Sequence, residues 1–487
     1  MLKSSLSIAV LFCITALSVN AKLELNPLFA SNSVLQRNTP INIWGKSSSG
    51  AKVMINFADS QKEVTANRDG EWQVSFPQMQ AGGPYRITAK SDGKSVLSDN
   101  IMIGDVWVCT GQSNMYWGMS KILDSKNEIK KAANPNLRLF TVKRHAADAP
   151  VDSVVGTWLP ASPYTVGNFS AVGYFFGETL QQETKLPIGL IMSTVGGTLA
   201  NNWTSLEVLR DNPDSSTYFE RYDREKAAYP AAKAEYEIKV KTDPKTPKPR
   251  PPERRQPGGY YNGMIAPLHS FPVAGIIWYQ GESDSWKHWH YDRFLHDMIA
   301  DWRKQWDAPD MPFLIVQLAG FSGKKGVNEN YPEVREIQRQ IASEPNNGLA
   351  VTIDVGEADD IHPRNKRPVG ERLAQTALAQ VYGRDIPYQG PHPVSVERSG
   401  KEVIITLNSG AKKTIDKNGG TLEGFEVAGE DEVFHPASAS LDGETITVSS
   451  SSVSSPVAVR YAWDGFPPTD LVNDAGLPAS PFKESIQ

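Results

Sequence analysis

The chain has 487 residues, of which 40% are hydrophobic and 22% are charged, and its formal net charge is −5. This length exceeds what one hydrophobic core supports, so two or three domains are expected. The small negative charge and ordinary composition indicate neither a nucleic-acid-binding protein nor a basic face for a membrane.

The first 21 residues are predicted to be a signal peptide. Lys3 supplies a positive charge, residues 8–17 form an apolar core, and small residues precede a cut before Lys22. The apolar core is too short to cross a bilayer, and no later segment is long enough. Of the two cysteines only Cys109 remains after cleavage, which excludes an internal disulfide. We therefore expect a bacterial periplasmic or secreted protein without a membrane anchor.

Residues 22–100 are predicted to form a small antiparallel β domain. Short runs rich in β-branched and aromatic residues alternate with turn residues, and no helical periodicity interrupts them. The expected strands are residues 41–45, 52–57, 72–76 and 85–89.

Residues 101–388 are predicted to form an α/β domain. Continuous apolar runs alternate with amphipathic helical segments, which is typical of a parallel sheet covered on both faces. Functional groups then collect at the carboxyl ends of the strands. A charged, proline-rich excursion near residues 205–260 interrupts this pattern. The expected strands are residues 106–108, 188–192, 274–279, 313–316 and 349–353.

Residues 389–487 return to a β pattern. Alternating runs at 402–407, 445–448 and 458–463 predict a second β region, which could pack against the first. The overall expectation is an α/β domain flanked by N- and C-terminal β domains.

A serine follows the first strand of the α/β domain at a sharp break. Gly111 permits a tight turn, and Ser113 lies just beyond it. A nucleophile presented above a sheet edge occupies this kind of position, where a backbone N–H can stabilise an oxyanion. An ordinary turn with a helix-capping serine fits this stretch equally well.

Polar groups also follow the next two strands. Gly196 and Gly197 end the second strand, where they can donate backbone N–H groups or form a plain turn. Gln280, Glu282 and Asp284 follow the third strand. All five positions are expected at the same edge of the sheet as Ser113.

The loop after the last strand carries a histidine near several carboxylates. His362 suits a general base, and Asp359, three residues earlier, suits the carboxylate that orients it. Asp354, Glu357 and Asp360 lie in the same loop, and any of them could take the place of Asp359. A plain loop histidine is the alternative.

Three histidines, His288, His290 and His296, lie near Asp292 and Asp297 in a pattern that could suggest a metal cluster. His288 and His290 do not share a helix face, and the surrounding aromatic residues resemble a core. No metal and no cofactor are expected.

The combined motifs resemble the sialate O-acetylesterase family of SGNH hydrolases. The resemblance rests on residues 111–115 (GQSNM), 195–198 (VGGT), 278–283 (WYQGES) and 359–363 (DDIHP). It extends over most of the mature chain, to residues 34–37 (VLQR), 81–85 (AGGPY), 261–265 (YNGMI) and 460–463 (RYAW).

The resemblance implies a flavodoxin-like parallel sheet with a catalytic triad. Ser113 would be the nucleophile, His362 the general base and Asp359 its orienter. The oxyanion hole would combine the backbone N–H groups of Ser113 and Gly196 with the side chain of Gln280. Many SGNH enzymes have an asparagine where this chain has Gln280.

The same motifs suggest residues that contact the substrate. The candidates are Asn114, Trp203, Glu282 and Asp284. Relatives often have an asparagine where this chain has Asp284, which leaves the role of that position open. Trp203 offers an aromatic face for a sugar, although a core position is as compatible with the sequence.

The leading hypothesis is an exported serine esterase that removes O-acetyl groups from carbohydrates, with O-acetylated sialic acids as the first choice. An acetyl esterase acting on a plant polysaccharide such as xylan or pectin is the alternative. A carbohydrate-binding protein with a vestigial esterase site is the alternative from another class. Intact Ser113, Asp359 and His362 argue against the binding protein.

Overall fold

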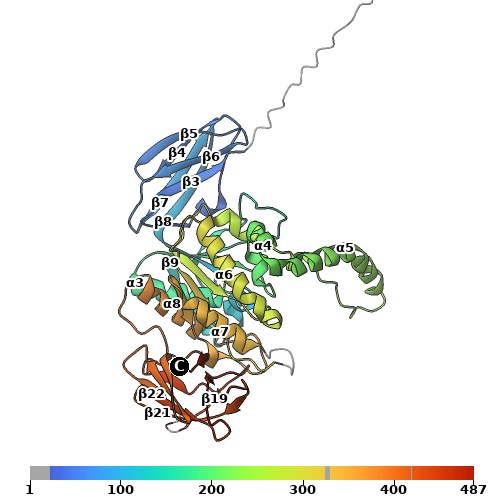
Figure 1. Cartoon of the computed structure of the whole chain (residues 1–487). Helices are drawn as coiled ribbons and strands as arrows, with labels where there is room; N and C mark the ends of the chain where they lie inside the picture. Colours follow the sequence, from blue (N-terminus) through green and yellow to red (C-terminus); the bar gives the residue numbers. More distant parts are fainter. Residues whose placement is uncertain (1–21, 324–329, 418, 420, 487) are drawn as a thin grey trace, which may run out of the picture.

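The computed structural model of the chain describes residues 22–323, 330–417, 419 and 421–486. The predicted signal peptide, residues 1–21, lies outside the described residues. An α/β region occupies the middle of the molecule, with one β region at either end (Figure 1). The two β regions therefore do not pack face to face, although the sequence left that arrangement open.

The central sheet is built around β8 (Lys94–Gly111). The strand order is β10-β9-β11-β8-β12-β13-β14, and these strands are parallel except for β10, which runs antiparallel to β9. The other strands of this order are β9 (Asn134–Thr141), β10 (Trp158–Ala161), β11 (Ile188–Thr194), β12 (Gly275–Tyr279), β13 (Phe313–Val316) and β14 (Asn347–Ala350).

The central strands are buried on both faces. Every residue of β11, β12 and β13 is buried, which explains why their sequences are apolar without alternation. Helix α3 packs beside α8, and α6 packs beside α7. The helices of this region are α1 (Ser113–Tyr116), α2 (Ser125–Lys131), α3 (Ala171–Thr184), α6 (His288–Gln305), α7 (Tyr331–Ala342) and α8 (Arg367–Gln380).

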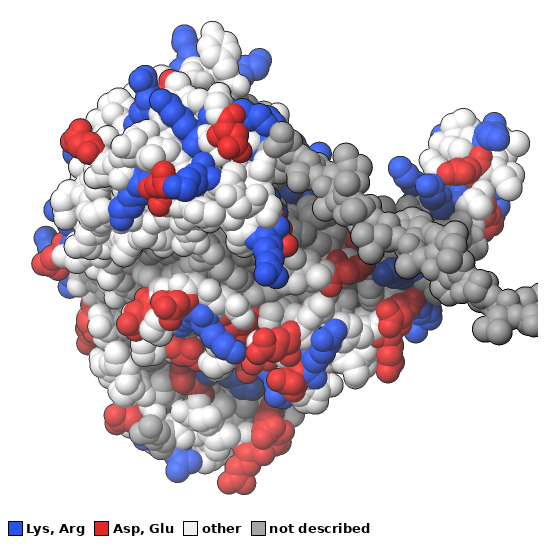
Figure 2. All heavy atoms as spheres, turned by 90° about the horizontal axis from the view of Figure 1, so that it is seen from above, with Lys and Arg blue, Asp and Glu red and all other residues white. Residues whose placement is uncertain are grey.

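The predicted excursion forms α4 (Leu206–Asp211) and the long α5 (Ser216–Lys239). Helix α5 extends away from the body of the molecule, and most of its second half is exposed (Figure 1). Acidic and basic side chains are interspersed over the face seen in Figure 2. Exposure explains why this segment is charged and poor in apolar residues.

The N-terminal β region is joined to the central sheet by a shared strand and a shared core. Strand β8 pairs with β7 in the β region and then continues into the parallel sheet. One hydrophobic core includes buried residues of both regions. The strands before β8 are β1 (Glu24–Leu25), β2 (Val34–Gln36), β3 (Ile41–Lys46), β4 (Lys52–Phe57), β5 (Ser60–Thr65), β6 (Glu71–Phe76) and β7 (Gly82–Ser91).

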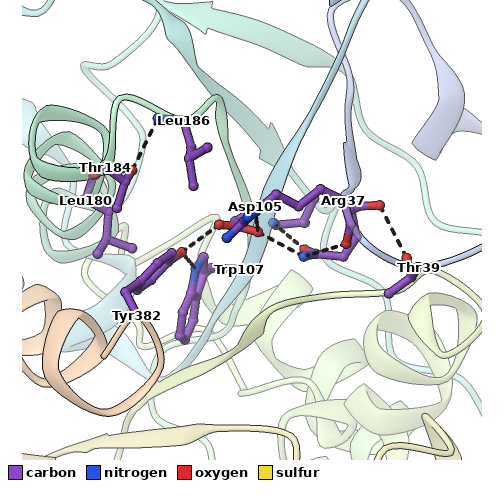
Figure 3. A network of polar contacts seen from close by, with 10 residues as sticks. Arg37, Thr39, Asp105, Trp107, Leu180, Thr184, Leu186 and Tyr382 are labelled. Carbon is purple, nitrogen blue, oxygen red and sulfur yellow. Dashed lines mark hydrogen bonds and ion pairs between the residues drawn. The ribbon is translucent and has the colours of Figure 1, made fainter. Parts of the chain in front are cut away.

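A polar network reinforces this junction at the buried Asp105 (Figure 3). Its Oδ1 accepts hydrogen bonds from Gln36 Nε2 at 3.0 Å and from Arg37 Nε at 2.8 Å. Its Oδ2 accepts one from the Tyr382 hydroxyl at 3.0 Å. The 34–37 motif thus holds the N-terminal region against β8, and Asp105 remains paired in the interior.

The C-terminal β region has a separate hydrophobic core. Its strands form sheets of their own, and Phe482 and Tyr461 pack in the same cluster. The strands are β15 (His392–Ser399), β16 (Glu402–Asn408), β17 (Thr414–Asp416), β18 (Thr421–Leu422), β19 (Phe425–Ala428), β20 (Phe434–Pro436), β21 (Ser438–Asp442), β22 (Thr445–Ser449), β23 (Ala458–Tyr461), β24 (Leu471–Asn473) and β25 (Phe482–Ser485).

Among the described residues, no helix has the length and apolar content that crossing a bilayer requires. Cys109 is a buried free thiol in β8, and burial raises its pKa well above the usual value.

Candidate active site

Ser113 lies just past the carboxyl end of the central strand β8. Gly111 has φ +126°, and a Cβ at this position would lie 2.2 Å from the carbonyl oxygen of Tyr279 on β12. A glycine is therefore required where β8 bends sharply next to its neighbour. Ser113 starts α1 and is partly exposed, as a nucleophile must be.

His362 faces Ser113 from the loop between β14 and α8. Its Nε2 is 2.9 Å from Ser113 Oγ, which is hydrogen-bonding distance for proton transfer. The ring of Trp117 is stacked on the imidazole, with ring centroids 4.6 Å apart and an interplanar angle of 11°. The structure thus brings together the two residues that the sequence analysis assigned as nucleophile and base, although they are 249 positions apart.

The carboxylate beside His362 belongs to Asp360. Its Oδ1 is 3.8 Å from His362 Nδ1 and accepts a hydrogen bond from the His362 backbone N–H at 2.9 Å. Asp359, the expected orienter, is exposed, and its side chain has no hydrogen-bond or ion-pair partner within the described residues. The loop turns Asp359 outward because Asp360 closes the turn onto the His362 backbone. Asp354 instead pairs with Arg372.

Glu357, the last carboxylate of this loop, also points elsewhere. Its Oε1 accepts a hydrogen bond from the backbone N–H of Arg364 at 2.7 Å. It therefore braces the loop rather than the imidazole.

Gly196 approaches Ser113 from the end of β11. A Cβ at position 196 would lie 3.3 Å from the Cβ of Ser113, which shows how close the two backbones are. Val195 N donates to Gly111 O at 3.2 Å and ties the two turns together. Within the described ranges, the backbone N–H groups of Ser113 and Gly196 donate to no protein acceptor. Both are available to an oxyanion.

Gln280, the third expected oxyanion donor, uses its amide protons elsewhere. It is fully buried, and its Nε2 donates to Thr198 O at 3.1 Å and to the carboxylate of Asp284. An amide nitrogen has two protons, so neither is left for an oxyanion in this structure. Gln280 instead holds the turn that contains Gly196.

The four expected substrate contacts are turned inward. Trp203 has no exposed surface, and its Nε1 donates to Thr198 Oγ1 at 2.9 Å, so its ring cannot stack on a sugar. Asp284 is 1% exposed, and its Oδ2 accepts from Ala200 N at 3.1 Å. Trp203 fits the core alternative, and Asp284 supports the loop after β11.

Asn114 and Glu282 belong to a buried network with a lysine that sequence reasoning missed. The carboxylate of Glu282 accepts a hydrogen bond from Asn114 Nδ2. Asn114 Oδ1 accepts one from Lys366 Nζ at 2.5 Å. Lys366 is completely buried, but it carries no sequence signal, because a lysine in a loop is normally solvated. Burial lowers the pKa of Lys366 to about 7 and raises that of Glu282.

The pKa of His362 is lowered from its ordinary value. The main cause is burial of the ring, and the positive charges of Lys366 and Lys121 act in the same direction. The Asp360 carboxylate opposes them. A neutral imidazole is therefore favoured, and this is the form that accepts a proton from serine.

Two of the three histidines near Asp292 and Asp297 have other partners. The His290 ring is 3.1 Å from the Tyr218 hydroxyl, and His296 lies 3.2 Å from Glu344. Among the described residues, no group of three or more His, Cys, Asp or Glu side chains is arranged to hold a metal ion.

A cavity of about 550 Å³ lies away from Ser113 and His362. It lies between the α/β region and the C-terminal β region, and its lining includes Arg339, Arg372, Tyr388 and His392. Neither Ser113 nor His362 lines it, so the candidate active site is the open edge of the sheet at β8.

The arrangement of a serine, a histidine and free backbone donors at one sheet edge agrees with a comparison to protein families. Residues 103–239 and 253–379 match the family model described as carbohydrate esterase, sialic acid-specific acetylesterase. The chain belongs to this family. It is therefore a carboxylic ester hydrolase acting as a carbohydrate O-acetylesterase.

Individual relatives of this carbohydrate esterase support the same assignment. A sialate O-acetylesterase from Mus musculus is 28% identical over 470 residues, covering 87% of this chain and 86% of the relative. The Homo sapiens sialate O-acetylesterase is 26% identical, with 93% and 91% covered. The crystal structure of a carbohydrate acetylesterase from Xanthomonas citri superposes with a TM-score of 0.83 at 34% identity, covering 95% of this chain and 99% of that one.

Proposed function

We propose that this esterase is exported and removes O-acetyl groups from sialic acids by a serine mechanism on an SGNH-type, flavodoxin-like sheet. The observation that carries the mechanism is the 2.9 Å approach of His362 Nε2 to Ser113 Oγ at the end of β8. Counting β8 as the first strand, the order β11-β8-β12-β13-β14 corresponds to 2-1-3-4-5, the flavodoxin-like order. Strands β9 and β10 extend the sheet beyond β11.

The proposed reaction has two halves. His362 accepts the Ser113 proton as the hydroxyl oxygen attacks the acetyl carbonyl carbon. The N–H groups of Ser113 and Gly196 stabilise the tetrahedral oxyanion, and protonated His362 returns the proton to the departing sugar oxygen. Water, activated by His362, then releases acetate from the acyl-serine.

The orienting carboxylate in this proposal is Asp360, with Asp359 as the competing assignment. Asp360 is the carboxylate beside His362 Nδ1, and it opposes the lowering of the imidazole pKa. The stacked ring of Trp117 also restrains the imidazole, so orientation does not depend on one carboxylate alone.

Substitution of Ser113 tests the mechanism. Ser113→Ala removes one partly exposed oxygen, so the fold is expected to remain while turnover of a simple acetyl ester falls by several orders of magnitude. Circular dichroism and turnover on 4-nitrophenyl acetate measure both effects. Retention of more than a few per cent of wild-type turnover would contradict the nucleophile assignment.

A substrate panel tests the sugar. Purified enzyme is incubated with O-acetylated sialic acids and with acetylated xylan, and acetate release is measured. The proposal expects a higher kcat/KM on the sialic acids. The reverse preference would favour the polysaccharide alternative.

Export is tested on protein from the native host. The mature chain is expected to start near Lys22 and to occur outside the cytoplasm. N-terminal sequencing decides the matter, and a chain that retains Met1 would contradict export.

A further inference from the structure

Lys366 is a buried lysine that directly precedes α8. None of its surface is exposed, and its Nζ donates to Asn114 Oδ1 at 2.5 Å. An ammonium group without solvent needs strong compensating partners. The role of Lys366 is therefore sought in the contacts that its ammonium group makes inside the protein.

Asn114 connects the two loops that carry the catalytic pair. It follows Ser113 directly, and its Nδ2 donates to the carbonyl oxygen of Ile361 at 3.0 Å. Ile361 directly precedes His362. A single amide side chain thus joins the nucleophile turn to the histidine loop.

The orientation of that amide depends on what faces each of its ends. Asn114 Oδ1 faces the Lys366 donor, and Nδ2 faces two acceptors, Ile361 O and the Glu282 carboxylate. Only one of the two amide orientations satisfies all three contacts. Without the lysine, the oxygen end loses its donor and the amide is free to rotate.

We propose that Lys366 is a positioning residue that, through Asn114, holds the Ser113 turn and the His362 loop at the separation proton transfer requires. The inference rests on the proposed serine mechanism, because it assigns a role toward that catalytic pair. An error of about 1 Å in such a separation costs about 100-fold in rate.

The charges around Lys366 support a second effect on the same pair. The carboxylates of Glu282, Asp360 and Glu357 raise its pKa against the larger effect of burial, and its Nζ lies 5.3 Å from the ring centroid of Tyr279. The lysine is therefore mostly cationic at pH values below about 7.

This cation lowers the pKa of His362. Burial of the imidazole is the larger cause, Lys121 contributes in the same direction, and Asp360 acts against both. Removing the charge of Lys366 should therefore raise the pKa of His362. The acid side of the kcat/KM profile should move to higher pH, because the base must be neutral to act.

Lys366→Met is the first test. It keeps the length of the side chain and removes the donor and the charge. We expect kcat on 4-nitrophenyl acetate to fall about 100-fold with KM changed less than about 2-fold, since the loss concerns the reacting geometry. The acid limb of the kcat/KM profile, where activity falls as the pH falls, should also move to higher pH. An unchanged kcat would overturn the inference.

Two further variants separate position from charge. Lys366→Gln is neutral but can still donate a hydrogen bond to Asn114. Its kcat should therefore be higher than that of Lys366→Met, while its acid limb should remain at higher pH than that of the wild type. Lys121→Met is the matched control, because it removes an exposed cation that also affects His362 without touching Asn114. It should shift the acid limb and keep kcat within about 2-fold.

A double-mutant cycle tests the route through Asn114. If Lys366 acts through this amide, Lys366→Met added to Asn114→Ala should cause little further loss of kcat, whereas independent effects would multiply. Multiplying losses would contradict the proposal. If circular dichroism shows that Lys366→Met does not fold, the same double-mutant cycle is measured with Lys366→Gln and Asn114→Ala.

Ser113→Ala is measured in parallel. If this variant stays active, the serine mechanism itself fails. If it is inactive while Lys366→Met retains full kcat, only the positioning role fails.

Discussion

At the scale of single residues, His362 is held by contacts of different chemical kinds. Ser113 lies at its Nε2, Trp117 covers one ring face, and Asp360 lies on the Nδ1 side at 3.8 Å with a half-exposed side chain. A carboxylate at this distance and exposure acts mainly through its charge and through the His362 backbone. We expect its loss to cost less than the loss of the base.

The two adjacent aspartates provide a direct test. Asp360→Asn should lower kcat at least about 10-fold, because it removes the charge that stabilises the imidazolium. Asp359→Asn should stay close to wild type, because Asp359 is exposed. His362→Ala should approach the loss of Ser113→Ala. Turnover on one acetyl ester ranks the variants, and a larger effect for Asp359→Asn would return the orienting role to that residue.

The pH profile reports the environment of the imidazole. Burial holds the pKa of His362 below its ordinary value of 6.5, so kcat/KM should begin to fall only below about pH 6.5. Trp117→Ala exposes the ring, which should raise the pKa and move this limb to higher pH. An acid limb of the wild type above pH 7 would contradict the direction of the shift.

At the scale of elements, the strand-to-helix turn after β8 depends on the absence of a side chain. Gly111 combines a positive φ with backbone contact to Tyr279 of β12. Two parallel strands must part at this point so that Ser113 and the loop after β12 fit side by side. Gln112 then bridges them, since its N–H donates to Tyr279 O at 2.9 Å.

Gly111→Ala should therefore damage both stability and activity. The added Cβ would lie 2.2 Å from a carbonyl oxygen, so we expect the free energy of unfolding to fall by about 2 kcal/mol or more and kcat to fall with it. Gly50→Ala is the control, because Gly50 also has a positive φ, +72°, but no atom lies within 4 Å of the added Cβ. Gly50→Ala should lower the free energy of unfolding by about 1 kcal/mol and leave kcat unchanged. Urea unfolding and turnover measure both, and equal effects would contradict the steric argument.

At the scale of the whole molecule, the two β regions are attached in different ways. The N-terminal region shares β8 and a hydrophobic core with the α/β region. The C-terminal region has its own core, and backbone carbonyls at its edge bind Arg335 of α7. This buried guanidinium donates to Leu318 O and Ala319 O on one side and to Asp464 O and Gly465 O on the other.

Arg335→Met should loosen the C-terminal region. Four carbonyl oxygens lose a charged donor. We therefore expect the contact between the two regions to lose about 3 kcal/mol or more of stabilising free energy. Calorimetry should then show a separate transition at lower temperature for the region with the independent core. Arg339→Met, which removes a partly exposed arginine that pairs with Glu336 and Glu484, is the milder control. A single unchanged transition for Arg335→Met would contradict this role.

The sequence alone determined the α/β class and the β regions at both ends, and it identified Ser113 and His362 as candidates for the active site. Hydrophobic periodicity and glycine-rich breaks are local signals, and they placed β3, β4, β11, β12 and β13 close to their observed bounds. The sequence analysis did not identify strand β9 or helices α7 and α8.

The tertiary structure alone decided which side chains lie beside Ser113 and His362. Whether Asp359 or Asp360 faces the imidazole depends on how one loop turns, and spacing along the chain does not specify that. The inward placement of Trp203, the hydrogen bonds of Gln280 and the burial of Lys366 depend on packing between segments distant in sequence. A chain position constrains backbone placement, but the direction and solvation of a side chain follow from what packs against it.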